Sequence, residues 1–398
     1  MSGIFLVAAK RTPFGAFGGS LKHLSATDLG VHSTQAALQS ANIDPAQVDS
    51  VFFGNVIQSS SDAAYLARHV GLRSGVDQTT PCLTINRLCG SGFETVILGA
   101  QSIQLGESKI AVCGGTENMS NAPLVAAGND ARWGVKLSKG LNMRDSLWDG
   151  LTDSYAGTPM GITAENLAKK YGITRQECDE FALQSQQRWA AAQEMGVFDD
   201  EIAPVEVKTR KGTMEMMATD EHPRPSTTLE QVQKLRPTFD KEGVVTAGSA
   251  SGICDGAGTV VVASEEAALG GGDLQPLCRL VSYAVVGCDP TIMGIGPVPA
   301  IRQALAKAGK TIQDVDRFEI NEAFAAQFLA CAKELDLDMA KTNTHGGAIS
   351  IGHPLGASGS RITSHLAHEF ANDPSVNLSV GAACIGGGQG IALVLERV

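Results

Sequence analysis

Short apolar segments alternate with helical patterns along most of the chain, and this alternation restricts the possible folds more than any other feature of the sequence. Gly3–Ala9, Val51–Phe53 and Arg317–Ile320 are typical of buried strands. A helix beginning near Gly92 would carry apolar residues on one face, at Phe93, Val96, Ile97, Ala100 and Ile103. The alternation predicts an α/β protein with largely parallel sheets that are covered by helices on both faces.

The composition and the pattern of the sequence change between about Asn121 and Ala250. This stretch holds all three tryptophans and several long polar helical patterns. Thr174–Glu177 is a capping box, which predicts the start of a helix running to about Glu194. We expect the stretch to be an insertion that forms its own layer, and Gly270–Gly272 to be a linker.

Two similar patterns indicate an internal duplication. Leu88–Gly92 precedes a helix, which is followed by a strand that we expect to end at Gly114–Gly115. Gly356–Ser360 also precedes a helix, which is followed by a strand near Leu378–Val380 and a glycine run at Gly386. The similar spacing suggests two like halves.

Composition excludes several classes of protein. Only 18% of the 398 residues are charged, which excludes disorder as the dominant state, and no apolar run approaches the length of a membrane span. The net charge of −11 argues against a general basic field for nucleic acid. The nine cysteines are scattered without a CxxC pair, so we expect a reducing compartment, no disulfide framework and no metal site. The N-terminus enters a strand almost at once, which argues against secretion.

Four residues on glycine-rich or strand-end loops are candidates for chemistry. Cys89 lies at a strand-to-helix turn, where the positive end of the helix dipole favours the thiolate. His353 precedes a similar turn, and histidine is the natural base for a thiol. Cys384 and Asn321 come at strand ends, where open α/β sheets place their sites. Each residue alone also has a structural interpretation, as an inert buried cysteine or a polar side chain satisfied by the backbone.

Together, these and neighbouring segments resemble the signature set of the thiolase family, in that family's order. The matching segments are Lys10-Arg-Thr-Pro-Phe-Gly15, Asn86-Arg-Leu-Cys-Gly-Ser-Gly92, Gly114-Gly-Thr-Glu-Asn-Met-Ser120, Asn321-Glu-Ala-Phe324, Gly346-Gly-Ala348, Gly352-His-Pro-Leu-Gly-Ala-Ser-Gly359 and Cys384-Ile-Gly-Gly-Gly-Gln-Gly390. Gln58–Asp62, Arg68–Leu72 and Cys288–Pro290 resemble the mitochondrial branch that acts on 3-ketoacyl-CoA.

The resemblance implies an acyltransferase that cleaves 3-ketoacyl-CoA with CoA, reversibly, to acetyl-CoA and a shortened acyl-CoA, as in fatty acid β-oxidation. It implies a ping-pong route in which Cys89 carries the acyl group, His353 is the base and Cys384 is a second acid/base. The backbone N–H groups of Cys89 and Gly386 would hold one oxyanion. His353 and a water held by Asn321 would hold the enolate oxygen.

The implied fold has two similar α/β halves with mixed five-stranded sheets and helices on both faces, plus an inserted loop domain. Residues 1–120 with 251–272 would form the N-terminal half, residues 121–250 the loop domain that binds CoA, and residues 273–398 the C-terminal half.

By the same resemblance, Arg224, Thr227 and Ser251 would contact CoA, the co-substrate, and the reaction would need no metal or redox cofactor. The implied partners are acyl-CoA and CoA, in a homodimer or homotetramer. The implied location is the mitochondrial matrix with an uncleaved signal, with the cytoplasm as the alternative. His345 and Ser249 depart from the family, which commonly has Asn at both positions, and their effect is open.

Several other functions share parts of this pattern. An acetoacetyl-CoA thiolase shares all the motifs. A ketoacyl synthase typically pairs its nucleophilic cysteine with two histidines, and Cys384 argues against that. A Cys–His hydrolase needs no second thiol, and a non-catalytic CoA-binding protein would not need the intact set.

Overall fold

The computed structural model describes residues 3–209, 211–271 and 274–398. The predicted domain boundary between residues 272 and 273, and the last residue of the predicted Gly270–Gly272 linker, therefore lie outside the described residues.

A single mixed sheet runs through the molecule, in the order β14-β15-β16-β13-β1-β12-β5-β3-β4, with β2 paired to β12. Its strands are β1 (Ile4–Arg11), β2 (Gly15–Ala16), β3 (Ser50–Gly54), β4 (Cys82–Ile85), β5 (Ile110–Asn118), β12 (Cys254–Ser264), β13 (Cys278–Gly287), β14 (Arg317–Ile320), β15 (Leu378–Ile385) and β16 (Gln389–Glu396).

The two halves of this sheet have the same topology. In the first half, β4, β3 and β5 are parallel, and β12 and β1 follow antiparallel. In the second half, β14 and β15 are parallel, and β16 and β13 follow antiparallel. In the second half, a parallel bridge between Thr342 and Phe318 of β14 occupies the position that β4 occupies in the first half. The repeated order supports an internal duplication.

The expectation of largely parallel sheets is wrong. Most neighbouring strands in the sheet are antiparallel, because β1, β12, β13 and β16 each pair in that sense with all their long neighbours. The α/β class with a mixed sheet holds. The two halves also join, since Ile4–Leu6 of β1 pairs with Cys278–Leu280 of β13. This pairing covers two strand edges that would otherwise carry unpaired backbone groups.

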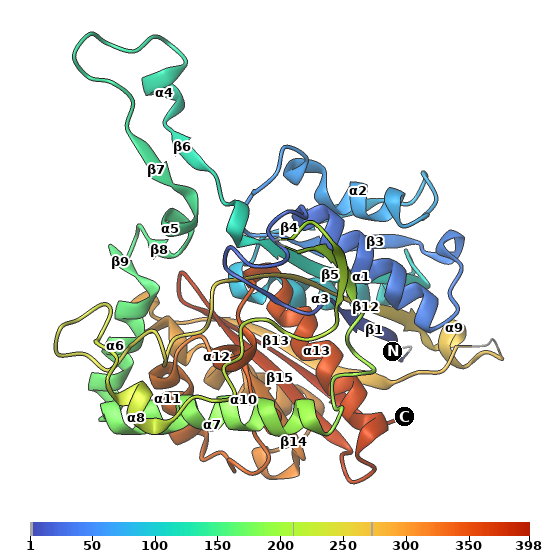
Figure 1. Ribbon diagram of the computed structural model, residues 1–398. Helices are drawn as coiled ribbons and strands as arrows, with labels where there is room; N and C mark the ends of the chain where they lie inside the picture. The colour runs from blue at the N-terminus through green and yellow to red at the C-terminus, as the bar shows by residue number, and fades with distance from the viewer. Residues whose placement is uncertain (1–2, 210, 272–273) are drawn as a thin grey trace.

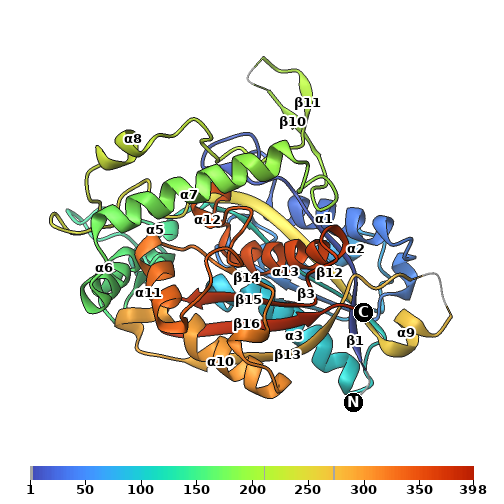
Figure 2. The same ribbon diagram turned by 90° about the horizontal axis from the view of Figure 1, so that it is seen from below.

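Helices cover both faces of the sheet. Figure 2 shows α13 and α10 on opposite sides of strands β14–β16. The helices of the two halves are α1 (Ala26–Ser40), α2 (Leu66–Arg73), α3 (Ser91–Gln104), α9 (Glu265–Leu269), α10 (Pro297–Ala308), α11 (Ala325–Leu335), α12 (Ala348–Ile351) and α13 (Leu355–Asn372). Short 3₁₀ helices are η1 (Pro45–Gln47), η2 (Ala63–Tyr65), η3 (Leu88–Gly90), η4 (Met119–Asn121), η5 (Pro290–Ile295) and η6 (Ile312–Asp314).

Helices α3 and α13 form the central layer of the molecule. Apolar residues of both helices share one buried core with β1, β5 and β12 of the first half and β15 and β16 of the second. The helix predicted near Gly92 is confirmed, and its five predicted core residues are all buried. Both helices are therefore held between the two halves, with the loops that precede them pointing to the same region.

Strand β5 does not end at Gly114–Gly115 as expected but runs on to Asn118. These two glycines allow close packing and do not form a turn. A Cβ at Gly115 would lie 1.8 Å from the carbonyl oxygen of Gly356, and one at Gly114 would lie 2.4 Å from the ring of Phe53. Removing side chains here lets the start of α13 rest directly on the strand.

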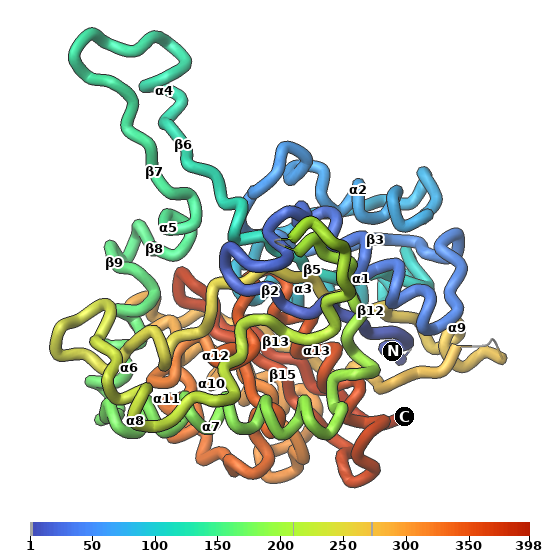
Figure 3. Tube along the Cα trace, in the orientation of Figure 1, coloured from blue at the N-terminus to red at the C-terminus, as the bar shows by residue number. Residues whose placement is uncertain are grey.

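The insertion packs mainly on the second half. Its elements are β6 (Leu124–Ala126), α4 (Gly128–Ala131), β7 (Met143–Asp145), α5 (Ser146–Gly150), β8 (Thr152–Asp153), β9 (Thr158–Pro159), α6 (Met160–Tyr171), α7 (Arg175–Glu194), β10 (Val205–Lys208), β11 (Met214–Met217) and α8 (Leu229–Gln233). The predicted capping box at Thr174 and Glu177 is present and opens α7. Leu167 and Phe181 share a core with α10 and α11. The β6–α4–β7 segment projects from the body as an arm (Figures 1 and 3).

Within the described ranges, no helix combines the length and apolar character that crossing a membrane requires.

Candidate active site

Two parallel strands bring Asn321 and Cys384 together. Ile320, the last residue of β14, is in register with Ala382 of β15, and the amide of Asn321 donates to the Ala382 carbonyl at 2.9 Å. Cys384 follows two residues later and packs against Ala323. Because the carboxyl ends of parallel strands meet at one edge, the loop after β14 and the end of β15 line the same region.

Cys89 reaches this region from the other half of the molecule. It lies in η3, directly before α3, and Leu88 has a φ of +46°, a left-handed conformation that is uncommon for leucine. The Cys89 thiol accepts hydrogen bonds from its own backbone N–H and from that of Gly386, just beyond β15. A Cβ at Gly90 would lie 2.5 Å from Cδ1 of Ile385, so the turn and the strand end are in direct contact. Two N–H donors thus converge on one sulfur.

The pKa of the Cys89 thiol is opposite to the expectation. Burial raises it to about 11, and the two N–H donors oppose this shift without overcoming it. The expected thiolate at the helix N-terminus is therefore wrong for the resting protein, because the desolvation of a buried sulfur outweighs the donors around it. A proton acceptor is needed to make this sulfur nucleophilic.

His353 is positioned by a tight turn between α12 and α13. Gly352 before it has a φ of +107°, and a Cβ there would lie 2.1 Å from Sγ of Cys254. The His353 Nδ1 lies 2.6 Å from Oγ of Ser358, and that hydroxyl donates to the Pro354 carbonyl at 3.1 Å. In the tautomer that satisfies both contacts, Nδ1–H donates to Oγ and Nε2 carries the free lone pair.

Burial lowers the pKa of His353 to about 4, with the charge of Arg361 acting in the same direction. The imidazole is therefore neutral near pH 7. Burial likewise raises the pKa of Cys384 well above its usual value, and the neighbouring Cys89 adds to this effect. The resting set is two thiols and a neutral imidazole, which is a set able to pass protons to and from a bound substrate.

Asn321 lies against the imidazole with one polar atom unused. Its Nδ2 is 3.4 Å from Nε2 and 3.5 Å from Nδ1 of His353. Its Oδ1 is buried and has no hydrogen-bond partner among the described residues. An unpartnered buried carbonyl beside a candidate base is suited to hold a water or a substrate group.

A surface cavity of about 730 Å³ lies between the insertion and α12, and Cys89, His353, Cys384 and Asn321 are not among its lining residues. Arg224 and Thr227 line it, together with the loop at Ala247–Gly248. Within the described chain, the Arg224 side chain makes no hydrogen bond or ion pair, so its guanidinium is free to meet an anion. Ser251 is not among the lining residues. Its amide donates to the Ala323 carbonyl, which places Ser251 between the cavity and the Asn321 loop.

Three further residues support the site, although the sequence analysis assigned them no role. Ser358 orients His353, as described above. Glu117 is fully buried and accepts from the backbone amides of Val56, Ile57 and Gly356, so it ties the start of α13 to the first half. Glu117 and Ser358 lie inside motifs that the sequence analysis recognised, so their place in those motifs could have indicated a role. His222 lines the cavity and had no such signal.

The two unusual residues noted in the sequence lie outside the reacting cluster. Ser249 closes the loop beside the cavity, where its Oγ accepts from the Thr246 amide at 2.9 Å. His345 lies on the segment before α12 and contacts α13. Neither side chain is placed to touch Cys89.

Family models match nearly the entire chain. The model described as "Thiolase, N-terminal domain" matches residues 4–266, and "Thiolase, C-terminal domain" matches residues 274–397.

Individual proteins match over their full length. The chain is 58% identical to human mitochondrial 3-ketoacyl-CoA thiolase over 396 residues, which cover 100% of this chain and 98% of that protein. It is 49% identical to an acetyl-CoA acetyltransferase of Escherichia coli K12, with 100% of both chains covered. The crystal structure of human mitochondrial 3-ketoacyl-CoA thiolase superposes with a TM-score of 0.97 at 57% identity, covering 100% of this chain and 99% of that one. The same enzyme in complex with CoA superposes with a TM-score of 0.96 at 57% identity, covering 100% of this chain and 98% of that one.

Proposed function

The chain belongs to the thiolase family, and from that premise we propose that it is a 3-ketoacyl-CoA thiolase of fatty acid β-oxidation. It cleaves a 3-ketoacyl-CoA with CoA to give acetyl-CoA and an acyl-CoA shortened by two carbons. The observation that carries the proposal is the convergence of Cys89, His353, Cys384 and Asn321 from both halves of the molecule on one buried site.

In the first half-reaction, Nε2 of His353 takes the proton of the Cys89 thiol, and the sulfur attacks the 3-keto carbon. The bond between C2 and C3 then breaks. Its electron pair leaves as the enolate of acetyl-CoA, which takes a proton from the thiol of Cys384. The acyl group stays on Cys89 as a thioester.

In the second half-reaction, the thiol of incoming CoA loses its proton to the Cys384 thiolate and attacks the thioester carbonyl. Cys89 leaves as a thiolate and recovers its proton from His353. Every group then has its starting protonation, so the cycle balances without a metal or redox cofactor. CoA is the only co-substrate.

Two sets of donors stabilise the negative charge that develops on oxygen. The N–H groups of Cys89 and Gly386 already converge on the thiol, so they are oriented toward a carbonyl oxygen attached there. The protonated Nε2 of His353 and a water held by Oδ1 of Asn321 serve the enolate oxygen, which accounts for the unpartnered amide oxygen.

CoA would lie along the cavity between the insertion and the second half. Arg224 would meet a phosphate or stack on adenine, Thr227 would add a polar contact, and Ser251 would bond the pantetheine chain near the reacting groups. The relative in complex with CoA supports a CoA site in this fold. Residues 121–250 would thus form the CoA-binding loop domain, between the half made of 1–120 with 251–272 and the half made of 273–398.

We further propose a homodimer or homotetramer in the mitochondrial matrix, with a cytoplasmic location as the alternative. Similarity to mitochondrial thiolases supports the location. The arm exposes apolar side chains that suit contact with another copy, including Trp133, Leu137 and Leu141.

The acetoacetyl-CoA thiolase is the second candidate, because an acetyl-CoA acetyltransferase matches at 49% identity. CoA-dependent loss of acetoacetyl-CoA and of a medium-chain 3-ketoacyl-CoA separates the two. We expect both to be cleaved, with the higher kcat/KM for the medium-chain substrate. Cys89→Ser should be inactive, whereas Cys82→Ser, outside the site, should keep its activity. Cleavage of neither substrate by folded protein would refute the proposal, and preference for acetoacetyl-CoA would favour the second candidate.

A further inference from the structure

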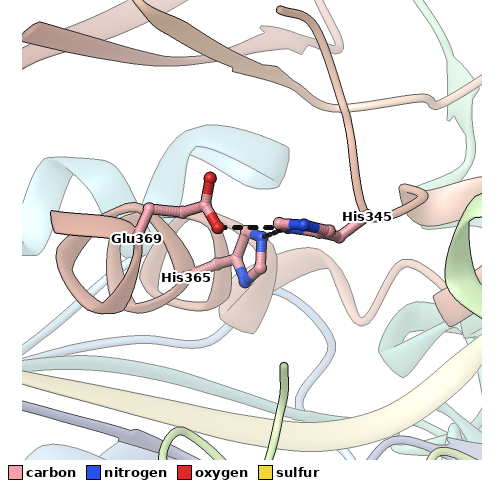
Figure 4. A group of neighbouring side chains, drawn as sticks. All are labelled: His345, His365 and Glu369. Carbon is pink, nitrogen blue, oxygen red and sulfur yellow. Dashed lines mark hydrogen bonds and ion pairs between the residues drawn. The ribbon is translucent and has the colours of Figure 1, made fainter. Parts of the chain in front are cut away.

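Three side chains outside the Cys89 cluster direct metal-ligating atoms at one another (Figure 4). His365 and Glu369 lie one turn apart on α13, and His345 reaches them from the segment that precedes α12. The His345 Nδ1 is 3.1 Å from Nε2 of His365 and 3.2 Å from Oε1 of Glu369. The three donor atoms all lie within 4.8 Å of one another.

These separations match the spacing of ligands around a small divalent ion. Zinc binds imidazole nitrogen and carboxylate oxygen at about 2.0–2.2 Å in tetrahedral geometry. Two such ligands then stand roughly 3.3 Å apart, which follows from that bond length and the tetrahedral angle. The two short separations, 3.1 and 3.2 Å, are close to that value, and the third is at most 4.8 Å.

The groups behind these ligands fix their orientation. The other ring nitrogen of His365, Nδ1, lies 2.7 Å from Oε2 of Glu201, and Glu201 is in turn held by Arg11. This carboxylate–histidine pair is the arrangement that usually stands behind a metal-bound imidazole, because it directs the lone pair of the opposite nitrogen at the ion. The second oxygen of Glu369 is 3.2 Å from Nε of Arg317, which leaves Oε1 for the cluster.

Hydrogen bonding alone satisfies the cluster poorly. The His345 Nδ1 has two neighbours at nearly equal distance, His365 and Glu369, and a single ring proton bonds well to only one of them.

We propose that His345 Nδ1, His365 Nε2 and Glu369 Oε1 form a binding site for a divalent ion of the zinc class, with water as the fourth ligand. His345 is the most accessible of the three and borders a shallow surface pocket with Arg188 and Thr344, which gives the ion a route in. The sequence analysis predicted no metal site, because the fold alone brings residue 345 to the helix.

Such an ion would stabilise the structure and would take no part in the thiolase reaction. It would fasten the segment at 343–347 to α13. Asn343 in that segment donates to the Ile320 carbonyl and to Glu322, on either side of Asn321. A bound ion would therefore hold the loop that carries Asn321, and it would raise resistance to unfolding.

The test uses the full-length protein freed of metal with a chelator. Zinc binding is measured by equilibrium dialysis with elemental analysis, and the ligands are identified by X-ray absorption at the zinc edge. We expect one zinc per chain with nitrogen and oxygen ligands only. His345→Asn and Glu369→Gln should each weaken binding at least tenfold. His69→Asn, which makes the same change at a distant surface histidine, should bind zinc like the parent.

Three results would overturn the proposal. They are no stoichiometric binding at micromolar zinc, sulfur ligands at about 2.3 Å showing that free cysteines take the ion, and unchanged affinity in both cluster variants. Circular dichroism shows whether each variant is folded. The absorption measurement needs only the parent protein, so sulfur ligands would overturn the proposal even if a variant fails to fold.

Discussion

Gly92 of α3 and Gly359 of α13 are in direct backbone contact. A Cβ at Gly92 would lie 2.3 Å from the amide nitrogen of Ser360, and a Cβ at Gly359 would lie 2.3 Å from the amide nitrogen of Phe93. Each helix follows a loop that carries one proposed catalytic residue, with Cys89 before α3 and His353 before α13. The crossing of two glycines thus sets how closely the proposed nucleophile and its proposed base approach.

Gly359→Ala should damage both stability and turnover. Its new methyl group meets backbone, which cannot rotate away, so we expect a loss near the upper end of the usual ~1–3 kcal/mol for overpacking. We also expect kcat to fall, since the two helices must separate. Urea unfolding and steady-state thiolysis measure these effects. Gly128→Ala is the control, because a Cβ there meets nothing within 4 Å. Unchanged stability and activity in Gly359→Ala would contradict this account of the crossing.

Ser358→Ala should lower kcat about 10–100-fold with little change in KM, by analogy with the loss of other residues that orient a functional imidazole. The serine hydroxyl holds the proton of His353 on Nδ1, so its removal frees the other tautomer and loosens the ring. Ser364→Ala, on the same helix, should behave like the parent, because that buried hydroxyl has no partner within the described residues. A normal kcat in Ser358→Ala would exclude this positioning role.

Arg224→Ala should raise KM for CoA about tenfold and leave kcat nearly unchanged, because the guanidinium is proposed to bind CoA far from the reacting atoms. The parent's KM for CoA should also rise with ionic strength more steeply than that of the variant. Initial rates at varied CoA and salt measure both effects. Arg132→Ala, which removes an exposed arginine of the arm, should show neither. Equal KM values for parent and Arg224→Ala would place CoA elsewhere.

Stability should fall as pH rises from about 6.5 to about 9 in metal-free protein. The folded state raises the pKa of His365 from 6.5 to about 9, so folding binds a proton more tightly in this window. The stabilisation is complete below pH 6.5 and is lost as pH passes the folded-state value, up to about 3 kcal/mol. The charged and titratable groups around the ring are Glu201 with Arg11, Glu369 with Arg317, Glu319 with Arg361, and the imidazoles of His345 and His368.

Urea midpoints at several pH values, with chelator present, test this dependence. His365→Gln should flatten the slope between pH 6.5 and 9, whereas His69→Gln should keep it. A His365→Gln protein with the parent's slope would show that another group titrates there.

Much of the fold was predictable because it depends on local patterns. The apolar periodicity of α3 and the capping box at Thr174 are local signals, and both predictions are confirmed. Strand direction is different, because it depends on which strands become neighbours, and the sequence carries no local record of that. The pair Gly114–Gly115 looked like a turn, since only the approach of Gly356 reveals that it is a packing surface.

The sequence motifs indicated which residues to examine for a site, but they did not indicate the pKa values of those residues. The motifs pointed to Cys89, His353, Cys384 and Asn321, which lie together in the fold. The pKa of Cys89 could not be predicted, because burial by the opposite half outweighs the local helix terminus. The cluster at His345 could not be predicted from the sequence either, since residues 345 and 369 meet only after α12 and α13 fold against each other.

The most direct test is mass spectrometry of the Cys384→Ala protein after exposure to an acyl-CoA and, separately, to a 3-ketoacyl-CoA. In the proposed mechanism, acylation by acyl-CoA needs His353 and the two N–H donors, whereas cleavage of the keto substrate also needs the proton of Cys384. We predict an acyl thioester on Cys89 from acyl-CoA, with steady-state thiolysis lost. Full thiolysis by this variant, or an acyl group on any residue other than Cys89, would contradict the account.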